Sequence, residues 1–247
     1  MDQNFAQKTI AIIPARYHST RLEGKPLIDL SGKTLLERTF LQVKQAKNIS
    51  QIYIATDDQR IANHAQDFGA LVVFTDKNHP SGTDRCYEVI QKIEEKPDFI
   101  LNVQGDEPLI PPSYIDLLAE KLWQNQAITT LIYPLMLEKI LEKSVVKVVR
   151  TKSNRALYFS RSVIPFSVSE KNQNYFGHIG IYGFPRTIFD QIVKIPVSFL
   201  ECTESLEQLR WLENDFSIYT VAVEKPTFGV DTPADVEKIR QQLLSEK

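Results

Sequence analysis

The stretch TIAIIPARYHSTRLEGKPL, residues 9–27, decides the fold class of this chain. Its opening run, TIAIIPA, is apolar and rich in β-branched residues, which is typical of a strand buried on both faces of a sheet. A polar loop follows, and from Thr34 to Lys47 the apolar residues recur with helical spacing. The order of strand, loop and helix predicts the first unit of a parallel sheet covered by helices.

The same alternation continues over the first half of the chain. Apolar runs predict further strands at 51–56, 71–75 and 99–104. Helical spacing predicts further helices at 59–68, 84–95 and 112–123. Gly69 follows the first of these helices, in the position where glycine commonly ends a helix. We therefore expect an α/β fold with a Rossmann-like, doubly wound and mostly parallel sheet.

The pattern changes after residue 128. Strand-like segments with short polar connections lie at 129–135, 144–151, 155–162 and 178–184. Helices are predicted at 187–194, 203–213 and 233–244, and a last strand at 218–224. Because almost no helix is predicted between the first three of these strands, we expect an antiparallel section here. We expect one domain over residues 1–247, with a smaller β-rich section inserted at about 129–200.

The composition excludes several classes of protein. The chain has 247 residues, of which 43% are hydrophobic and 24% charged, and its formal net charge of −2 gives no reason to expect a nucleic acid as partner. The start, MDQNFAQK, lacks the pattern of a signal peptide, and no apolar run reaches the roughly 18–20 residues of a membrane helix. Two distant cysteines, Cys86 and Cys202, form no metal-binding pair or disulfide framework. These features predict a cytoplasmic protein without stable membrane insertion.

The loop after the first strand carries three cations, Arg16, Arg21 and Lys25. In open α/β sheets, ligands bind beyond the carboxyl ends of the strands, where such loops begin. Arginine forks match phosphate oxygens, and lysine supplies a movable positive charge. A solvated surface loop is the alternative, but the position after the first strand favours phosphate binding.

Two common nucleotide motifs are absent from the sequence. Gly32, Lys33 and Thr34 resemble the end of a P-loop, but that motif needs a glycine where Leu27 stands. A G-x-G-x-x-G motif is missing too, and three evenly spaced glycines at 177–183 lie in a strand-like run. The sequence therefore argues against a P-loop kinase and against a dinucleotide enzyme.

Two aspartates stand where strands are expected to lead into the ligand-binding edge. Asp106 follows an apolar strand and Gly105, and Asp231 precedes the helix that begins at Pro233. Carboxylates in such places are suitable ligands for Mg²⁺. Instead of binding a metal, Asp106 could form a turn and Asp231 could cap a helix. Glu107, which precedes a proline, could serve only to shape the turn. Two acids and a cationic loop together indicate metal-assisted nucleotidyl transfer.

The motifs of this chain resemble those of the CMP-Kdo synthetase family, in the same order and over residues 9–240. The matching segments are IPARYHSTRLEGKPL, ATDD, HPSGTDR, NVQGDEPLIPP, VVKVV, ALYFSR, HIGIYGF, SLEQLRWLEND and GVDTPADVE. The cationic loop alone is typical of any sugar nucleotidyltransferase. Its combination with QGDEP, ALYFSR, LEQLR and GVDTP is much more specific.

This resemblance implies a reaction and an architecture. CMP-Kdo synthetases couple CTP to 3-deoxy-D-manno-octulosonate (Kdo), giving CMP-Kdo and pyrophosphate for lipopolysaccharide synthesis. Their fold is of the nucleotide-diphospho-sugar transferase type, with a smaller β-rich dimerisation lid, and they are usually homodimers. The resemblance thus implies CTP and Kdo as substrates, Mg²⁺ as cofactor and a second copy of the chain as partner.

The resemblance also assigns residues to the nucleotide. The triphosphate would be bound by Arg16, Arg21 and Lys25, and Mg²⁺ by Asp106 and Asp231, which makes these five the expected catalytic residues. Pro14 and Ala15 would place their backbone against the nucleotide, with Gln104 near the nucleotide or the sugar. The loop that contains Ser81, Gly82 and Arg85 would face cytosine and the sugar pocket.

The acid sugar would be bound, by the same resemblance, by Arg161, His178, Tyr182, Glu207 and Gln208. The residues by themselves allow other roles: His178 and Tyr182 could be packing residues of one strand face, and Glu207 a surface partner of Arg210. Arg161 could stack on an aromatic ring. Departures from the family pattern, at Gly177 and at 196–201, leave 8-amino-Kdo or sialic acid as alternative sugars.

A neutral sugar phosphate as substrate and a non-catalytic nucleotide-binding protein are two further alternatives. The second would be expected to have lost a cation or an aspartate, yet every matching position is filled. The expected mechanism is an in-line attack of the anomeric oxygen of the sugar on the α-phosphorus of CTP.

Overall fold

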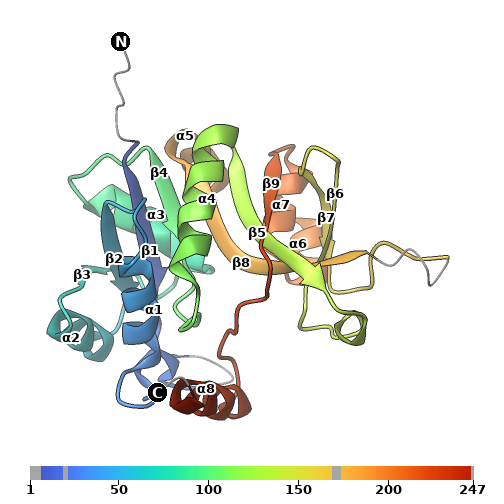
Figure 1. Cartoon of the computed structure of the whole chain (residues 1–247). Helices are drawn as coiled ribbons and strands as arrows, with labels where there is room; N and C mark the ends of the chain where they lie inside the picture. The colour runs from blue at the N-terminus through green and yellow to red at the C-terminus, as the bar shows by residue number, and fades with distance from the viewer. Residues whose placement is uncertain (1–6, 19–21, 169–173, 246–247) are drawn as a thin grey trace. The chain divides into compact units, whose positions relative to one another are not determined.

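The computed structural model describes residues 7–18, 22–168 and 174–245 (Figure 1). The chain divides into two compact units, one formed by residues 1–119 with 227–247 and the other by residues 120–226. The second unit is therefore an insertion in the first. The section expected at about 129–200 falls within this second unit, and its role as a dimerisation lid stays a prediction.

The first unit contains a four-stranded parallel sheet. Its strands are β1 (Thr9–Pro14), β2 (Gln51–Thr56), β3 (Leu71–Phe74) and β4 (Phe99–Asn102). They lie in the order β3-β2-β1-β4, with β1 paired to both β2 and β4. Three isoleucines of β1 are fully buried, as the continuous apolar run predicts. The expected parallel, Rossmann-like arrangement is confirmed.

Helices follow the strands of this unit. They are α1 (Leu35–Lys44), α2 (Gln59–Asp67), α3 (Gly82–Lys92), α4 (Pro112–Asn125) and α8 (Pro233–Ser245), with a short 3-10 helix η1 (Lys25–Leu27). Thr34, Asp58 and Ser81 each accept a hydrogen bond from a backbone N–H of the helix that they precede. Gly69 ends the α2 turn with a φ of 79°, as predicted.

The second unit is mixed, as the change of pattern after residue 128 predicts. Strand β5 (Ile128–Leu135) pairs antiparallel with β8 (Tyr175–Pro185) and parallel with β9 (Ile218–Ala222). Strand β6 (Lys147–Arg150) pairs antiparallel with β7 (Ala156–Ser160) and with β8. The remaining elements are η2 (Leu137–Lys139), α5 (Arg186–Ile192), α6 (Phe199–Glu204) and α7 (Gln208–Glu213).

The prediction of a single helix at 203–213 is wrong, because two short helices, α6 and α7, lie there. Helix α6 begins earlier, because Ser198 and Glu201 form a reciprocal capping box. It ends at Ser205, whose backbone is left-handed with a φ of 52°, and α7 begins after this break. A left-handed serine has no sequence signal comparable to glycine, so the break was missed.

No helix in the described part of the chain has both the length and the apolar character that a membrane span requires.

Candidate active site

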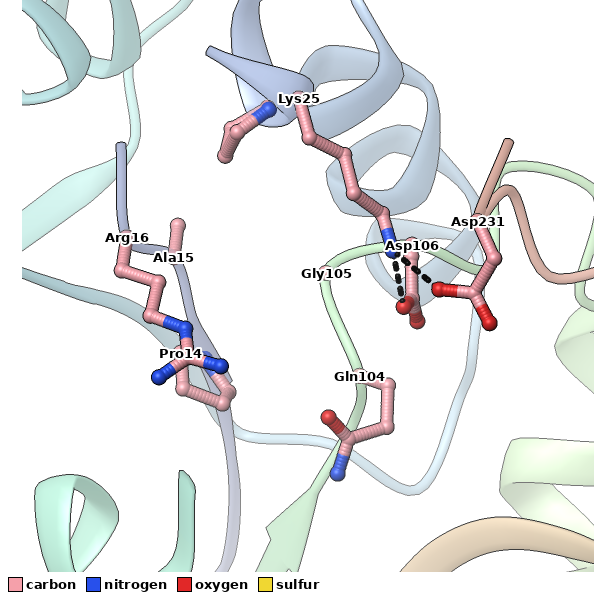
Figure 2. A pocket seen from close by; sticks show the side chains of 9 residues that line it. Pro14, Ala15, Arg16, Lys25, Gln104, Gly105, Asp106 and Asp231 are labelled. Atoms are coloured by element: carbon pink, nitrogen blue, oxygen red, sulfur yellow. Dashed lines mark hydrogen bonds and ion pairs between the residues drawn. The ribbon is translucent and has the colours of Figure 1, made fainter. Parts of the chain in front are cut away.

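A cavity of about 180 Å³ lies in the first unit, at the carboxyl ends of β1 and β4 (Figure 2). Its lining comes from three segments: the end of β1 with the cationic loop, the turn after β4, and the segment before α8. The lining residues are Pro14, Ala15, Arg16, Lys25, Pro26, Gln104, Gly105, Asp106 and Asp231. The parallel sheet thus brings the predicted loop and both predicted acids to one place.

Lys25 joins the two aspartates of this cavity. Its Nζ donates to Asp106 Oδ2 at 2.6 Å and to Asp231 Oδ1 at 3.0 Å. The two carboxylate oxygens are therefore at most about 5.6 Å apart, the sum of these distances. Figure 2 shows this group on one side of the cavity and Arg16 across from it. One cation already holds the two carboxylates together.

The backbone of the turn after β4 needs glycine at position 105. A Cβ atom there would lie 2.9 Å from the carbonyl oxygen of Pro14, which is closer than real Cβ contacts come. The turn is also tied to the segment before α8, because the N–H of Val230 donates to the carbonyl of Asp106 at 2.9 Å. These backbone contacts hold the segments that carry Asp106 and Asp231 next to each other.

A helix cap was the alternative to a metal-ligand role for Asp231. In the structure, Thr232 and Asp235 form the cap of α8. Thr232 Oγ1 accepts from the N–H of Asp235 at 3.3 Å, and Asp235 accepts in return from the N–H of Thr232 at 2.9 Å. This reciprocal pair caps the start of α8. The carboxylate of Asp231 reaches Lys25 instead.

Glu107 is part of the site electrostatics, a role that the sequence did not predict. Burial, followed by the charge of Asp106, raises the pKa of Glu107 to about 7. One carboxyl oxygen, Oε1, would lie 3.5 Å from a Cβ atom at Gly229. The other, Oε2, is buried with no hydrogen-bond partner among the described residues. The site therefore has more acid groups than Lys25 neutralises.

A second cavity of about 140 Å³ adjoins the first and shares Pro14, Ala15, Arg16 and Gln104 with it. Its other lining residues come from the loop between β3 and α3 and from the start of α3: His79, Pro80, Ser81, Gly82 and Arg85. The predicted loop residues Ser81, Gly82 and Arg85 are thus gathered here. His79 lines the same cavity and was not among the predicted residues.

Two of these residues are held firmly. Ser81 Oγ accepts from the N–H of Asp84 at 3.1 Å and donates to its carboxylate at 2.6 Å. Arg85 is buried, and its Nη1 donates to Thr75 Oγ1 at 2.5 Å and lies 3.6 Å from the carboxylate of Asp57. A fixed guanidinium is therefore part of the wall of this cavity.

The residues expected at the acid sugar lie in the second unit. His178 and Tyr182 of β8 have ring centroids 5.3 Å apart, and Tyr182 also meets Trp211 edge to face. His178 Nε2 bonds Thr130 Oγ1 at 2.9 Å, and burial lowers the pKa of His178 to about 3. Tyr182 Oη and Gln208 Nε2 are buried without a hydrogen-bond partner among the described residues. This aromatic cluster therefore contains polar atoms that a ligand could satisfy.

Arg161 and Glu207 are engaged in the protein. The Arg161 guanidinium donates to the carbonyls of Glu204, Lys143 and Ser205 at 2.9, 3.0 and 3.3 Å. Arg210 is buried, and it pairs with both Glu201 at 3.0 Å and Glu207 at 3.1 Å. The surface pair considered for Glu207 and Arg210 is thus wrong, since one partner is in the interior. The sugar-binding roles of Arg161 and Glu207 stay predictions.

Comparison with known proteins decides the family. The Cytidylyltransferase family model matches residues 10–220. A 3-deoxy-manno-octulosonate cytidylyltransferase of Parabacteroides distasonis is 45% identical to this chain, over 94% of the chain and 96% of the relative. One of Cytophaga hutchinsonii is 44% identical, over 93% and 95%. The chain belongs to the 3-deoxy-manno-octulosonate cytidylyltransferases.

A solved member of this cytidylyltransferase group has the same fold. The structure of a CMP:2-keto-3-deoxy-manno-octonic acid synthetase complexed with CTP matches with a TM-score of 0.93 and 38% identity. The match covers 97% of this chain and 100% of that one. The expected fold class, the nucleotide-diphospho-sugar transferase type, is confirmed by this likeness.

Most of the predicted nucleotide residues of this cytidylyltransferase lie at the two adjoining cavities. Arg21 is the exception, because it falls outside the described residues. The individual roles of these residues toward a ligand stay predictions. His79 and Glu107 were given no site role from the sequence, although both lie in segments that match the family, HPSGTDR and NVQGDEPLIPP.

The first cavity suits a divalent ion. Mg²⁺ is commonly held by one or two carboxylates, with water and substrate phosphates as its other ligands. Asp106 and Asp231 offer two such groups, and Oε2 of the neighbouring Glu107 is buried without a hydrogen-bond partner in the described part of the chain. Within the described residues, no group of three or more His, Cys, Asp and Glu side chains is placed to hold a metal by itself. A bound nucleotide would supply the missing ligands.

Proposed function

We propose that this chain transfers CMP from CTP to Kdo and releases pyrophosphate, as a magnesium-dependent homodimer in the cytoplasm that serves lipopolysaccharide synthesis. The single observation that carries the proposal is the Lys25 ammonium between Asp106 and Asp231, at the edge of a parallel sheet and across the cavity from Arg16. The relatives named for this reaction, and a likeness to a structure complexed with CTP, support it.

The cations of the first cavity would stabilise the charge that moves onto pyrophosphate. Arg16 and Lys25 line this cavity, and Arg21 belongs to the same loop of the sequence. Preorganised cations near a departing anion lower the barrier because they need no reorientation during the reaction. The oxygen of the sugar would attack the α-phosphorus in line with the leaving pyrophosphate. Positioning and electrostatics account for this chemistry without a covalent protein intermediate.

Asp106 and Asp231 would hold Mg²⁺. When bound, the ion would screen the phosphates from the sugar carboxylate and favour ionisation of the attacking hydroxyl. The flexible stem of Lys25 allows its ammonium to move from the carboxylates toward phosphate oxygens. We assign the acid sugar to the cluster of His178, Tyr182 and Gln208 in the second unit.

The second unit has large apolar side chains that are exposed to solvent, and burial of such residues is what the proposed homodimer would require. Met136, Leu141, Phe166, Val168 and Phe199 are each at least two-thirds exposed. Large apolar side chains in solvent commonly mark an interaction surface when they gather in one patch.

The test is a pyrophosphate-release assay with the four nucleoside triphosphates and three acid sugars, Kdo, 8-amino-Kdo and sialic acid. The proposal predicts release with CTP and Kdo that requires Mg²⁺ and stops when the ion is chelated. Faster release with 8-amino-Kdo or sialic acid would show that this other sugar is the substrate. The proposed reaction type, cytidylyl transfer, would still hold. Absence of release with CTP and every acid sugar would refute the proposed reaction.

A further inference from the structure

His79 and Glu88 form a pair beside the second cavity. Glu88 Oε2 bonds His79 Nε2 and also accepts from the N–H of Asp76 at 2.8 Å. The side chains of His79 and Glu88 are only 19% and 21% exposed. His79 belongs to the loop that lines the cavity, and Glu88 lies in the helix α3 that follows this loop.

Lys92 completes the support of this pair. Its Nζ lies 2.6 Å from Glu88 Oε1 and donates to the carbonyl of Phe74 at 2.7 Å. The loop is therefore tied to α3 at both Phe74 and Asp76. Glu88 is consequently a charged acceptor: burial alone would raise its pKa, but the hydrogen bonds from Lys92 and His79 outweigh burial and lower it to about 2.

The charge on Glu88 determines which nitrogen of His79 carries the proton. An ionised carboxylate accepts hydrogen bonds only, so the proton of a neutral imidazole must be on Nε2. The other nitrogen, Nδ1, is then an acceptor. The side-chain contact of His79 is made by Nε2 alone, so Nδ1 has no protein partner among the residues that the structure describes.

The other polar side chains of the second cavity are those of Arg16, Arg85, Ser81 and Gln104. Arg16 and Arg85 are donors only, so they match the carbonyl and ring-nitrogen acceptors of a pyrimidine. Ser81 Oγ is already bonded twice to Asp84. The carboxamide oxygen of Gln104 is the other side-chain acceptor, and Gln104 lines the first cavity as well as the second. Cytosine differs from uracil in having a 4-amino donor where uracil has a carbonyl acceptor.

We propose that His79 selects cytosine over uracil, by accepting a hydrogen bond from the 4-amino group at Nδ1, and that Glu88 is the positioning residue that fixes this tautomer. The inference rests on the proposed function, because it requires the base to occupy the second cavity. Without an acceptor at this point, two arginines would favour the extra carbonyl of uracil. A buried group that is left unpaired discriminates strongly between such ligands.

The test compares the ratio of kcat/KM for CTP to kcat/KM for UTP in the wild type and three variants. The assays are run at about pH 8, above the pKa of about 6.5 of an unperturbed imidazole. His79→Phe should lower the ratio at least about tenfold, and Glu88→Gln, which frees the tautomer, at least about fivefold. Lys92→Gln is the matched control, because it breaks the other contact of Glu88 and should leave the ratio within about twofold of the wild type.

The selectivity ratio separates base recognition from loop stability. If the pair only stabilises the loop, all three variants would lose activity with both nucleotides equally, and unchanged ratios would overturn the inference. Equal use of CTP and UTP by the wild type would also overturn it.

Calorimetric binding of CMP and UMP answers the same question where a variant is inactive. A preference of the wild type for CMP that His79→Phe removes supports the inference, and equal binding of both nucleotides contradicts it. A wild type that binds CMP selectively yet releases no pyrophosphate from CTP would refute the proposed function alone.

Discussion

Lys25 is the residue that links the parts of the candidate active site. Its side chain is 13% exposed, and its ammonium offsets two carboxylates that would otherwise repel each other. The positions of Lys25, Asp106 and Asp231 at strand ends predicted their convergence, because the carboxyl ends of parallel strands meet at one edge. Their direct pairing could not be predicted, since no local pattern encodes a contact between residues so far apart in the sequence.

Tyr182 tests the sugar assignment at the same scale. Its Oη is buried without a protein partner in the described chain, so Tyr182→Phe should leave the free energy of unfolding within about 1 kcal/mol of the wild type. If the hydroxyl binds the sugar, KM for Kdo should rise about tenfold while KM for CTP stays constant. Steady-state kinetics with each substrate varied in turn measure this. Equal KM values for Kdo in the two proteins would contradict the assignment.

At the scale of elements, strands were predicted more accurately than helix ends. The β-branched runs of β1 and β2 are clear signals of strands. The helix predicted at 84–95 begins earlier, at Gly82, because Ser81 caps it. The break between α6 and α7 was missed because Ser205 adopts a left-handed conformation that its side chain does not favour. The contact between His79 and Glu88 was missed too, because it joins a loop to a helix without a recognisable motif.

Ser205→Gly should stabilise the protein. Ser205 is exposed and has a φ of 52°, a conformation that glycine adopts without the cost of a Cβ atom. We expect a gain of roughly 0.5–1 kcal/mol in the free energy of unfolding, measured by urea denaturation. Ser205→Ala serves as the control and should give no such gain. A loss of stability in the glycine variant would show that the serine side chain stabilises the break.

Glu88 should make stability depend on pH at the acid end. Its folded-state pKa of about 2 lies below its ordinary value of 4.5, so its contribution is present above pH 4.5 and is lost as the pH falls toward 2. Glu88→Gln should therefore cost about 2 kcal/mol more at pH 7 than at pH 3. Urea unfolding of both proteins at the two pH values measures this difference. The same cost at both values would mean that the carboxylate charge does not stabilise the α3 loop.

At the scale of the whole molecule, the residues assigned to the nucleotide and those assigned to the sugar belong to different units. The first unit holds the two cavities assigned to the nucleotide, and the second holds the aromatic cluster assigned to the sugar. The strand-helix alternation predicted the first unit well. The extent of the second, residues 120–226, was not predicted, because its ends fall within α4 and after β9, where the composition does not change.

Asp106 and Asp231, from distant parts of the chain, are proposed to act together on one divalent ion. A double-mutant cycle with Asp106→Asn and Asp231→Asn tests this most directly, with kcat/KM for Mg²⁺-dependent pyrophosphate release as the measurement. Each single variant should lose at least about 100-fold, and the double variant should lose little more than either single one. Losses that multiply to about 10⁴-fold in the double variant, or single variants with nearly normal activity, would contradict a shared ion.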